Sequence, residues 1–194
     1  PAIRQYASGS EILILGRPRR LEITPLPNGR KRPVIELGAD SLTCALVPAD
    51  VFEVRSVLEK YLRRLARQDL TERTARWAER SGLFPRKVII GERTSRWGSC
   101  SPRGTLSFCY RLIMAPPEVI DAVVAHEICH LAHLNHSGRF YALLDKVCPD
   151  HQPVPFCQCM VFAVQEHKPG KGPGSTCGRR WQVCFCIQIG RFHP

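Results

Sequence analysis

Residues 126–136 read His-Glu-Ile-Cys-His-Leu-Ala-His-Leu-Asn-His, and the rest of the chain is best interpreted outward from this stretch. It contains the pattern H-E-x-x-H, with a further histidine six residues after the second one. In a helix, His126 and His130 project from one face, at the spacing that lets two imidazoles share one Zn²⁺. Glu127 then lies beside the ion, where a carboxylate can take a proton from a water molecule. The pattern predicts a metal-dependent hydrolase.

The sequence around the motif favours a buried helix. Val119–Leu134 carries apolar residues at helical spacing, and they are too numerous for a solvent-exposed helix. Ala115–Glu118 provides a helix start, with proline in the first turn and an acid near the positive end of the helix dipole. Because polar groups on such a helix must be satisfied, a metal ion bound between them is the expected solution.

Two histidines are candidates for the third metal ligand. His133 shares the helical face, but a rise of about 1.5 Å per residue places it about 10 Å along the axis from His126. Three imidazoles in a straight column do not surround a tetrahedral ion. A chain break after Leu134, favoured by the Asn-His-Ser-Gly sequence at 135–138, returns His136 toward the metal. We therefore expect His136 to be the third ligand and His133 to lie partly exposed or behind the ligands.

These residues resemble a known family. The sequences at 126–130 and 135–140 (Asn-His-Ser-Gly-Arg-Phe), together with Arg-Trp-Gly-Ser-Cys-Ser at 96–101, are similar to the YgjP-like metallopeptidases. The resemblance covers about residues 10–150 and extends, more distantly, to the SprT-like and WLM zinc peptidases. It implies a zincin-type fold in which three histidines bind zinc and a glutamate is the catalytic base. Those roles fall on His126, His130, His136 and Glu127.

The remaining sequence predicts an α+β single domain over residues 1–150, and the resemblance implies that this domain is zincin-like. The N-terminal part is β-rich, with short strands expected at Ile12–Leu15, Leu21–Thr24, Val34–Leu37 and Leu42–Val47. One or two helices are expected from 49 to 81. Strands at Lys87–Ile90 and Thr105–Leu112 are expected to form a hairpin. The segment that joins them contains a turn at Trp97-Gly98-Ser99 and the sequence Ser-Pro-Arg-Gly at 101–104, and Phe140–Val147 is expected to form a last short helix. The hairpin either binds an extended substrate as an added strand or merely covers the core.

The cysteines and the tail suggest a cytoplasmic protein with an atypical extension. The chain has ten cysteines and 44% hydrophobic residues. Five cysteines are scattered singly before residue 150, which fits buried free thiols in a reducing cytoplasm, and Cys129 is expected to be one of them rather than a ligand. The tail, 151–194, contains Pro-Gly-Lys-Gly-Pro-Gly and C-x-C pairs, a weak metal-binding pattern, and is expected to be poorly ordered. No apolar run reaches the length of a membrane span, so a membrane-spanning protein is not expected.

The net charge of +11 raises nucleic acid as a partner, although acids and bases alternate between 49 and 81 as on a solvated helix face. The leading prediction is a zinc-dependent peptidase with a protein or peptide substrate, using Zn²⁺ and Glu127. One alternative is a zinc-dependent nucleotide hydrolase of the pyrophosphatase type, although the sequence has no phosphate-binding G-x-x-x-x-G-K-[ST] loop. The other is a non-catalytic, zinc-stabilised nucleic-acid-binding module, which would use a closed four-ligand site including Cys129.

Overall fold

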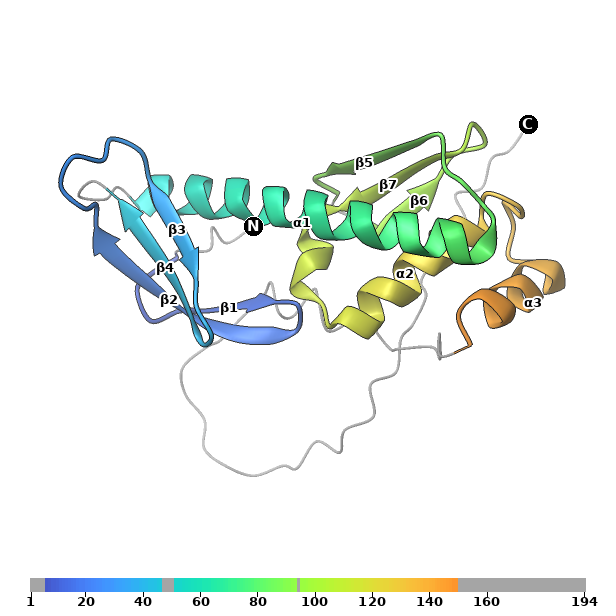
Figure 1. Ribbon diagram of the computed structural model, residues 1–194, viewed down its shortest axis with the longest axis horizontal. Coiled ribbons are helices and arrows are strands. Elements are labelled where there is room, and N and C mark those ends of the chain that lie inside the picture. Colours follow the sequence, from blue (N-terminus) through green and yellow to red (C-terminus); the bar gives the residue numbers. More distant parts are fainter. Residues whose placement is uncertain (1–5, 47–50, 94, 150–194) are drawn as a thin grey trace, which may run out of the picture. The chain divides into compact units, whose positions relative to one another are not determined.

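The computed structural model describes residues 6–46, 51–93 and 95–149, with two small sheets and three α-helices among them (Figure 1). The α+β class predicted from the sequence is confirmed. Among the described residues, no helix combines the length and the hydrophobicity that a bilayer span requires. The predictions made for the tail, 151–194, lie outside the described residues.

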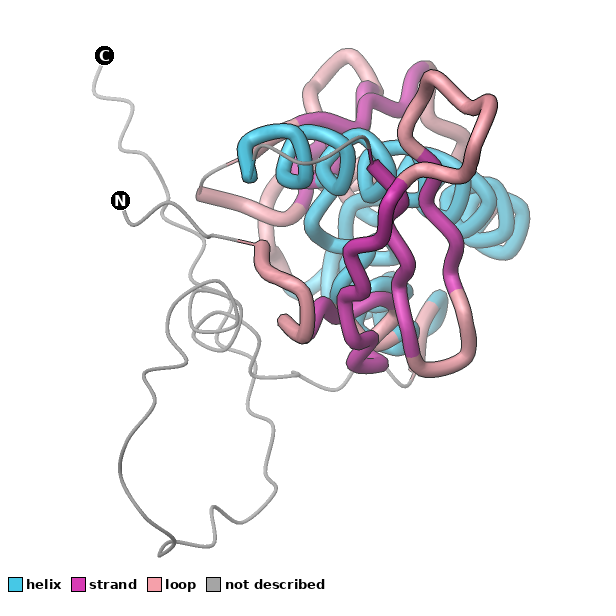
Figure 2. The backbone as a smooth tube through the Cα atoms, turned by 90° about the vertical axis from the view of Figure 1, so that its left-hand side faces the viewer, coloured by secondary structure: helices cyan, strands magenta, loops and turns pink. Residues whose placement is uncertain are grey.

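The first sheet contains β1 (Glu11–Ile14), β2 (Arg17–Pro25), β3 (Val34–Leu37) and β4 (Ser41–Leu46), in the order β1-β2-β4-β3. All four strands were predicted, and only β2 is much longer than expected. Figure 2 brings this sheet to the front of the view. β2 and β4 are parallel, whereas β1–β2 and β3–β4 are antiparallel. One face is buried through residues that alternate along the strands, such as Leu21, Leu42 and Cys44.

The β1–β2 turn connects this sheet to the region of the motif. Leu15 and Gly16 both have positive φ, as a tight hairpin turn requires. Their backbone N–H groups donate to the carbonyl oxygens of Ile113 and Met114, at 2.8 and 3.2 Å. A side chain at Gly16 would meet Pro116 at 2.8 Å, so glycine is needed for this close approach. The turn therefore holds the segment from which the motif helix starts.

The long helix α1 (Val51–Ser81) is one helix rather than two, and it contacts both sheets and both later helices (Figure 1). Its fully buried apolar residues follow one another at intervals of four, from Val54 through Leu58, Leu62, Ala66 and Leu70. Because each step of four residues turns about 40° past a full circle, the buried stripe winds around the helix. This winding matches the change of partner along α1, from the first sheet to the helices around the motif.

The second sheet differs from the predicted hairpin. It consists of β5 (Lys87–Gly91), β6 (Gly98–Cys100) and β7 (Thr105–Cys109), in the order β5-β7-β6. β5 and β7 are parallel neighbours, and the antiparallel hairpin is β6–β7. The expected turn at Trp97-Gly98-Ser99 is wrong because Gly98 belongs to the strand that fills the second edge of β7. The expected strand at Thr105–Leu112 is wrong at its end, where the chain tightens into the 3-10 helix η1 (Tyr110–Met114).

The motif helix α2 (Pro117–Cys129) begins where the sequence predicted, after Pro116. It is buried along almost its whole length. The last helix, α3 (Gly138–Val147), places Phe140 and Leu144 against Ala125 and Cys129 of α2. This packing confirms the predicted short helix and holds the loop between α2 and α3 at both ends.

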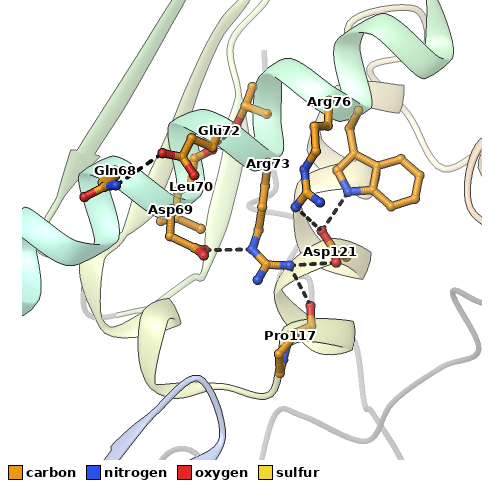
Figure 3. A network of polar contacts seen from close by, with 10 residues as sticks. Gln68, Asp69, Leu70, Glu72, Arg73, Arg76, Pro117 and Asp121 are labelled. Carbon is orange, nitrogen blue, oxygen red and sulfur yellow. Dashed lines mark hydrogen bonds and ion pairs between the residues drawn. The ribbon is translucent and has the colours of Figure 1, made fainter. Parts of the chain in front are cut away.

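A partly buried polar network joins α1 to α2 (Figure 3). The Asp121 carboxylate accepts hydrogen bonds from the Arg73 guanidinium at 2.7 Å and from the Trp77 indole at 2.9 Å. Arg73 also donates to Asp69 at 2.7 Å and to the carbonyl oxygen of Pro117 at 3.2 Å. Its guanidinium therefore binds the first turn of α2 as well as its middle, which fixes the motif helix against α1.

We expect Asp121→Ala to lower the free energy of unfolding by about 2–4 kcal/mol, because it removes one of the acceptors of the buried Arg73 guanidinium and the acceptor of the Trp77 indole N–H. Chemical denaturation followed by circular dichroism measures this change. Arg76→Ala is the matched control, since Arg76 lies 3.9 Å from the same carboxylate with a side chain 66% exposed. That change should cost no more than about 0.5 kcal/mol. Equal losses in the two variants would contradict the structural role assigned to the buried pair.

Candidate metal centre

Three histidine side chains converge at the end of α2. His126 lies in the last turn of the helix, His130 follows its last residue, and His136 comes from the loop before α3. The Nε2 atom of His126 is 3.1 Å from that of His130 and 3.0 Å from that of His136. Potential ligand atoms of all three lie within 4.8 Å of one another, the one such group of histidine, cysteine and acidic residues found in the described part of the chain.

The convergence depends on where α2 ends. The predicted continuation of the helix to Leu134 is wrong, because the N–H groups of Leu131 and Ala132 donate to carbonyl oxygens three residues back, at 2.9 and 3.1 Å. This tighter turn closes the helix near His130. The chain therefore reverses four residues earlier than expected and has enough length to bring His136 back over His126.

A backbone carbonyl fixes the orientation of one ligand. His130 Nδ1 lies 2.9 Å from the carbonyl oxygen of His133, and a carbonyl can only accept, so Nδ1 carries the proton. The lone pair of His130 is then on Nε2, which faces the other two histidines. His133 thus contributes its backbone carbonyl, which supports the ring of His130 from behind, one of the two positions expected for it. The imidazole of His133 does not belong to the group of three histidines.

The three imidazoles fit a tetrahedral ion. Nitrogen atoms about 2.0–2.1 Å from one Zn²⁺ would be about 3.3 Å apart, close to the separations found here. Burial lowers the pKa of His130, and burial together with the nearby His130 lowers the pKa of His136. The neutral form that can donate a lone pair to a metal is therefore favoured at neutral pH.

Phe140 packs behind the histidines as a common support. Its ring is stacked on His130, with centroids 4.6 Å apart, and meets His126 and His136 edge-on at 4.9 and 4.8 Å. Phe140 is fully buried, so it shields the imidazoles from water on that side. The sequence predicted its packing but not its contact with all three histidines.

Glu127 lies beside the histidines but outside their group. Only 7% of the residue is exposed, and its Oε2 atom has no hydrogen-bond partner among the residues that the structure describes. Burial raises the pKa of Glu127 to about 8, against the opposing effect of the positive charge of Arg96. A buried carboxyl group with an unused oxygen is suited to exchange a proton with a small molecule bound beside it.

Gly98 lies against Glu127 and belongs to the site, which the sequence did not predict. A Cβ atom on this residue of β6 would lie 2.6 Å from Cγ and 2.7 Å from Oε1 of Glu127. The backbone of β6 therefore forms the wall against which the carboxylate rests, and only glycine leaves room for it. A glycine within a strand is the available signal for such a close approach, but the Trp-Gly-Ser sequence was interpreted as a turn.

Other candidate residues are placed less directly. Cys129 is fully buried in the apolar cluster between α2 and α3, where burial and the nearby Cys148 raise its pKa to about 11, and it is not in the histidine group. This favours the interpretation of Cys129 as a buried thiol. Tyr141 lies with its ring 6.2 Å from that of His136 and is half exposed. The positive charge of Arg96 lowers the pKa of Glu127, so Arg96 lies near the site.

Comparisons with known proteins identify a family for this chain. A family model described as YgjP-like, metallopeptidase domain, matches residues 1–154. Among solved structures, the crystal structure of the metallopeptidase zymogen of Pyrococcus abyssi abylysin is similar, with a TM-score of 0.38 and 20% sequence identity over 41% of this chain and 80% of that chain. None of the curated proteins matches the chain in sequence.

Proposed function

The chain belongs to the YgjP-like metallopeptidase domain family, and we propose that it is a zinc-dependent peptidase that hydrolyses peptide bonds with Glu127 as the general base. The observation that carries this proposal is the pairing of three converging imidazoles with a buried carboxyl group next to them. Three protein ligands leave a fourth position for water or substrate, which is typical of catalytic rather than structural zinc.

The roles of the side chains follow from their positions. His126, His130 and His136 would hold the ion through Nε2, while Phe140 and the His133 carbonyl keep the rings in place. When bound, zinc would polarise the substrate carbonyl and acidify a nearby water molecule. In its carboxylate form, Glu127 accepts the proton of the attacking water and later delivers it to the leaving amine.

The strand β6 is the proposed guide for the substrate. In the described part of the chain it pairs with β7 alone, so its other edge can accept an extended peptide. Gly98 of this strand touches Glu127, which would place an added peptide beside the metal centre. The substrate-binding strand, expected anywhere in the 87–112 hairpin, is thereby narrowed to the free edge of β6. An edge of this kind favours a protein or peptide as the partner.

The two alternative functions have less support. A nucleotide hydrolase would need carboxylates for Mg²⁺, and no acidic residue joins the histidine group among the described residues. A closed four-ligand zinc site would need Cys129, which is buried elsewhere. Nucleic acid association stays a proposal based on the charge of +11 alone, and salt-sensitive DNA binding by the zinc-loaded protein would support it.

The test of the proposed function is metal content measured together with peptide cleavage. We expect His136→Ala to weaken zinc binding by at least about a hundredfold, since even residues behind metal ligands typically contribute 10–100-fold. His133→Ala is the matched control, because alanine keeps the carbonyl that orients His130. Chelator competition and elemental analysis measure the affinity. The difference between variants is the informative quantity, because cysteines beyond residue 150 can also bind zinc.

Activity is followed on an unfolded protein substrate and, in parallel, on nucleoside triphosphates. Removing zinc with a chelator should stop protein cleavage, and adding zinc back should restore it. Cleavage that survives complete removal of the metal would contradict a zinc peptidase. Nucleotide hydrolysis without protein cleavage would favour the pyrophosphatase-type alternative.

A further inference from the structure

A hollow of about 420 Å³ is bordered on one side by His130 of the metal centre. Three loops surround it: the one that follows α1, the one between β6 and β7, and the one between α2 and α3. His130 lines the hollow and also belongs to the histidine group. We call this hollow the loop pocket. A peptide bound at the metal centre therefore has the loop pocket next to it.

The loop pocket displays apolar side chains to solvent. Phe84 is 69% exposed and Leu134 is 58% exposed, more than any other large apolar residue described. Both line the loop pocket, together with Pro102 and Leu131. Exposed apolar groups gathered in one hollow mark a binding site more often than scattered ones do. Arg103 is the only charged residue among those that line the loop pocket. His130 also lines it, and burial lowers the pKa of His130, which favours the neutral imidazole.

We propose that the loop pocket binds one large apolar side chain of a peptide substrate, and that Arg103 favours an acidic residue beside it. This inference rests on the proposed peptidase function and adds the class of sequence that is cleaved. Consecutive residues of an extended chain are about 3.8 Å apart, so a peptide with a carbonyl at the metal centre has a neighbouring side chain within reach of a cavity that shares His130. The volume suffices for a single large side chain, since pockets for whole small ligands start at about 300 Å³.

The position of the loop pocket next to the metal centre and the charge of Arg103 indicate which molecule binds there. A cavity bordered by a proposed metal ligand lies within reach of the molecule on which the metal centre acts, and for a peptidase that molecule carries side chains on both sides of the scissile bond. The positive charge of Arg103 near the apolar side chains of Phe84 and Leu134 matches a phenylalanine or leucine next to an aspartate or glutamate. A lysine or arginine at the same place would meet repulsion.

The experiment measures binding in the zinc-loaded 194-residue chain carrying Glu127→Gln, which prevents turnover. Fluorescent peptides that differ only by phenylalanine or alanine at one central position are titrated by anisotropy. We expect the phenylalanine peptide to bind at least about tenfold more tightly, as burial of a large apolar side chain implies. Adding Phe84→Ala and Leu134→Ala should reduce this preference to less than about threefold. Adding Leu37→Ala is the control, since Leu37 is 43% exposed in β3 and does not line the loop pocket.

A second arm tests charge. With phenylalanine kept at the central position and glutamate or lysine placed next to it, we expect glutamate to be preferred, and we expect Arg103→Glu to reverse that order. Equal binding of the phenylalanine and alanine peptides overturns the inference, as does a preference that survives the loss of Phe84 and Leu134. Selective binding without cleavage by the wild-type chain would leave the loop pocket standing and contradict the peptidase activity. Cleavage without any phenylalanine preference would support the peptidase activity and contradict the role of the loop pocket.

Discussion

Replacing Glu127 with glutamine is expected to lower the rate of peptide hydrolysis by at least about a thousandfold while leaving the zinc content unchanged. Glutamine has nearly the same shape as glutamate but cannot accept a proton from water, and general-base catalysis typically contributes 10²–10⁴-fold. The carboxylate lies outside the group of three converging nitrogen atoms, so the ion does not depend on it. Cleavage of an unfolded protein and zinc per chain are measured on the same preparation.

Glu118→Gln provides the matched control. Glu118 lies in the first turn of the same helix, where it is exposed, so its substitution changes charge without touching the metal centre. Activity there should be that of the wild type. If Glu127→Gln retained full activity, the general base would be another group. If it lost zinc, the carboxylate would be holding the ion or the local fold rather than moving a proton.

The sequence was most informative where one short motif dictates geometry. The spacing of His126 and His130 and the offset of His136 predicted which imidazoles meet, and the structure brings these three together. The start of α2 was also predictable, because proline in the first turn and a following acid leave few alternatives. Local rules of this kind act over a few residues and need no knowledge of distant partners.

The errors arose where distant contacts decide the conformation. Gly98 looks like a turn residue in isolation, but it becomes part of β6 because β7 offers an unpaired edge and Glu127 needs room. The parallel pairing of β5 with β7 was equally hidden, since a hairpin is the default for strands that are close in sequence. The early end of α2 follows from a turn closed by Leu131 and Ala132, which carry no helix-breaking signal.

The division of the chain is still a prediction. The family match reaches residue 154 and the described residues end at 149, so the boundary proposed near residue 150 and the poor order expected of 151–194 are not tested by either. Limited proteolysis followed by mass spectrometry would test them. Rapid cleavage confined to positions beyond residue 150 would support the predicted boundary, and a fully protected tail would contradict it.

Gly98→Ala is expected to reduce kcat/KM for peptides by about a hundredfold or more without loss of zinc. The added methyl group would lie within 3 Å of three atoms of the Glu127 side chain, so the carboxylate must move. A misplacement of about 1 Å in a catalytic group can lower the rate about a hundredfold. The imidazoles come from α2 and the following loop, and β6 contributes none of them. Steady-state kinetics and zinc analysis of the purified variant measure both quantities.

Gly91→Ala is the matched control, because Gly91 ends β5 in the same sheet and an added Cβ there would meet nothing within 4 Å. Both variants should unfold at similar denaturant concentrations if the clash is relieved by a turn of the Glu127 side chain. The expected loss then falls mainly on kcat, since the edge of β6 proposed to align the substrate stays in place. A loss confined to KM would instead mean that the methyl group blocks the peptide, and unchanged kinetics would mean that the position of Glu127 against β6 is not needed for catalysis.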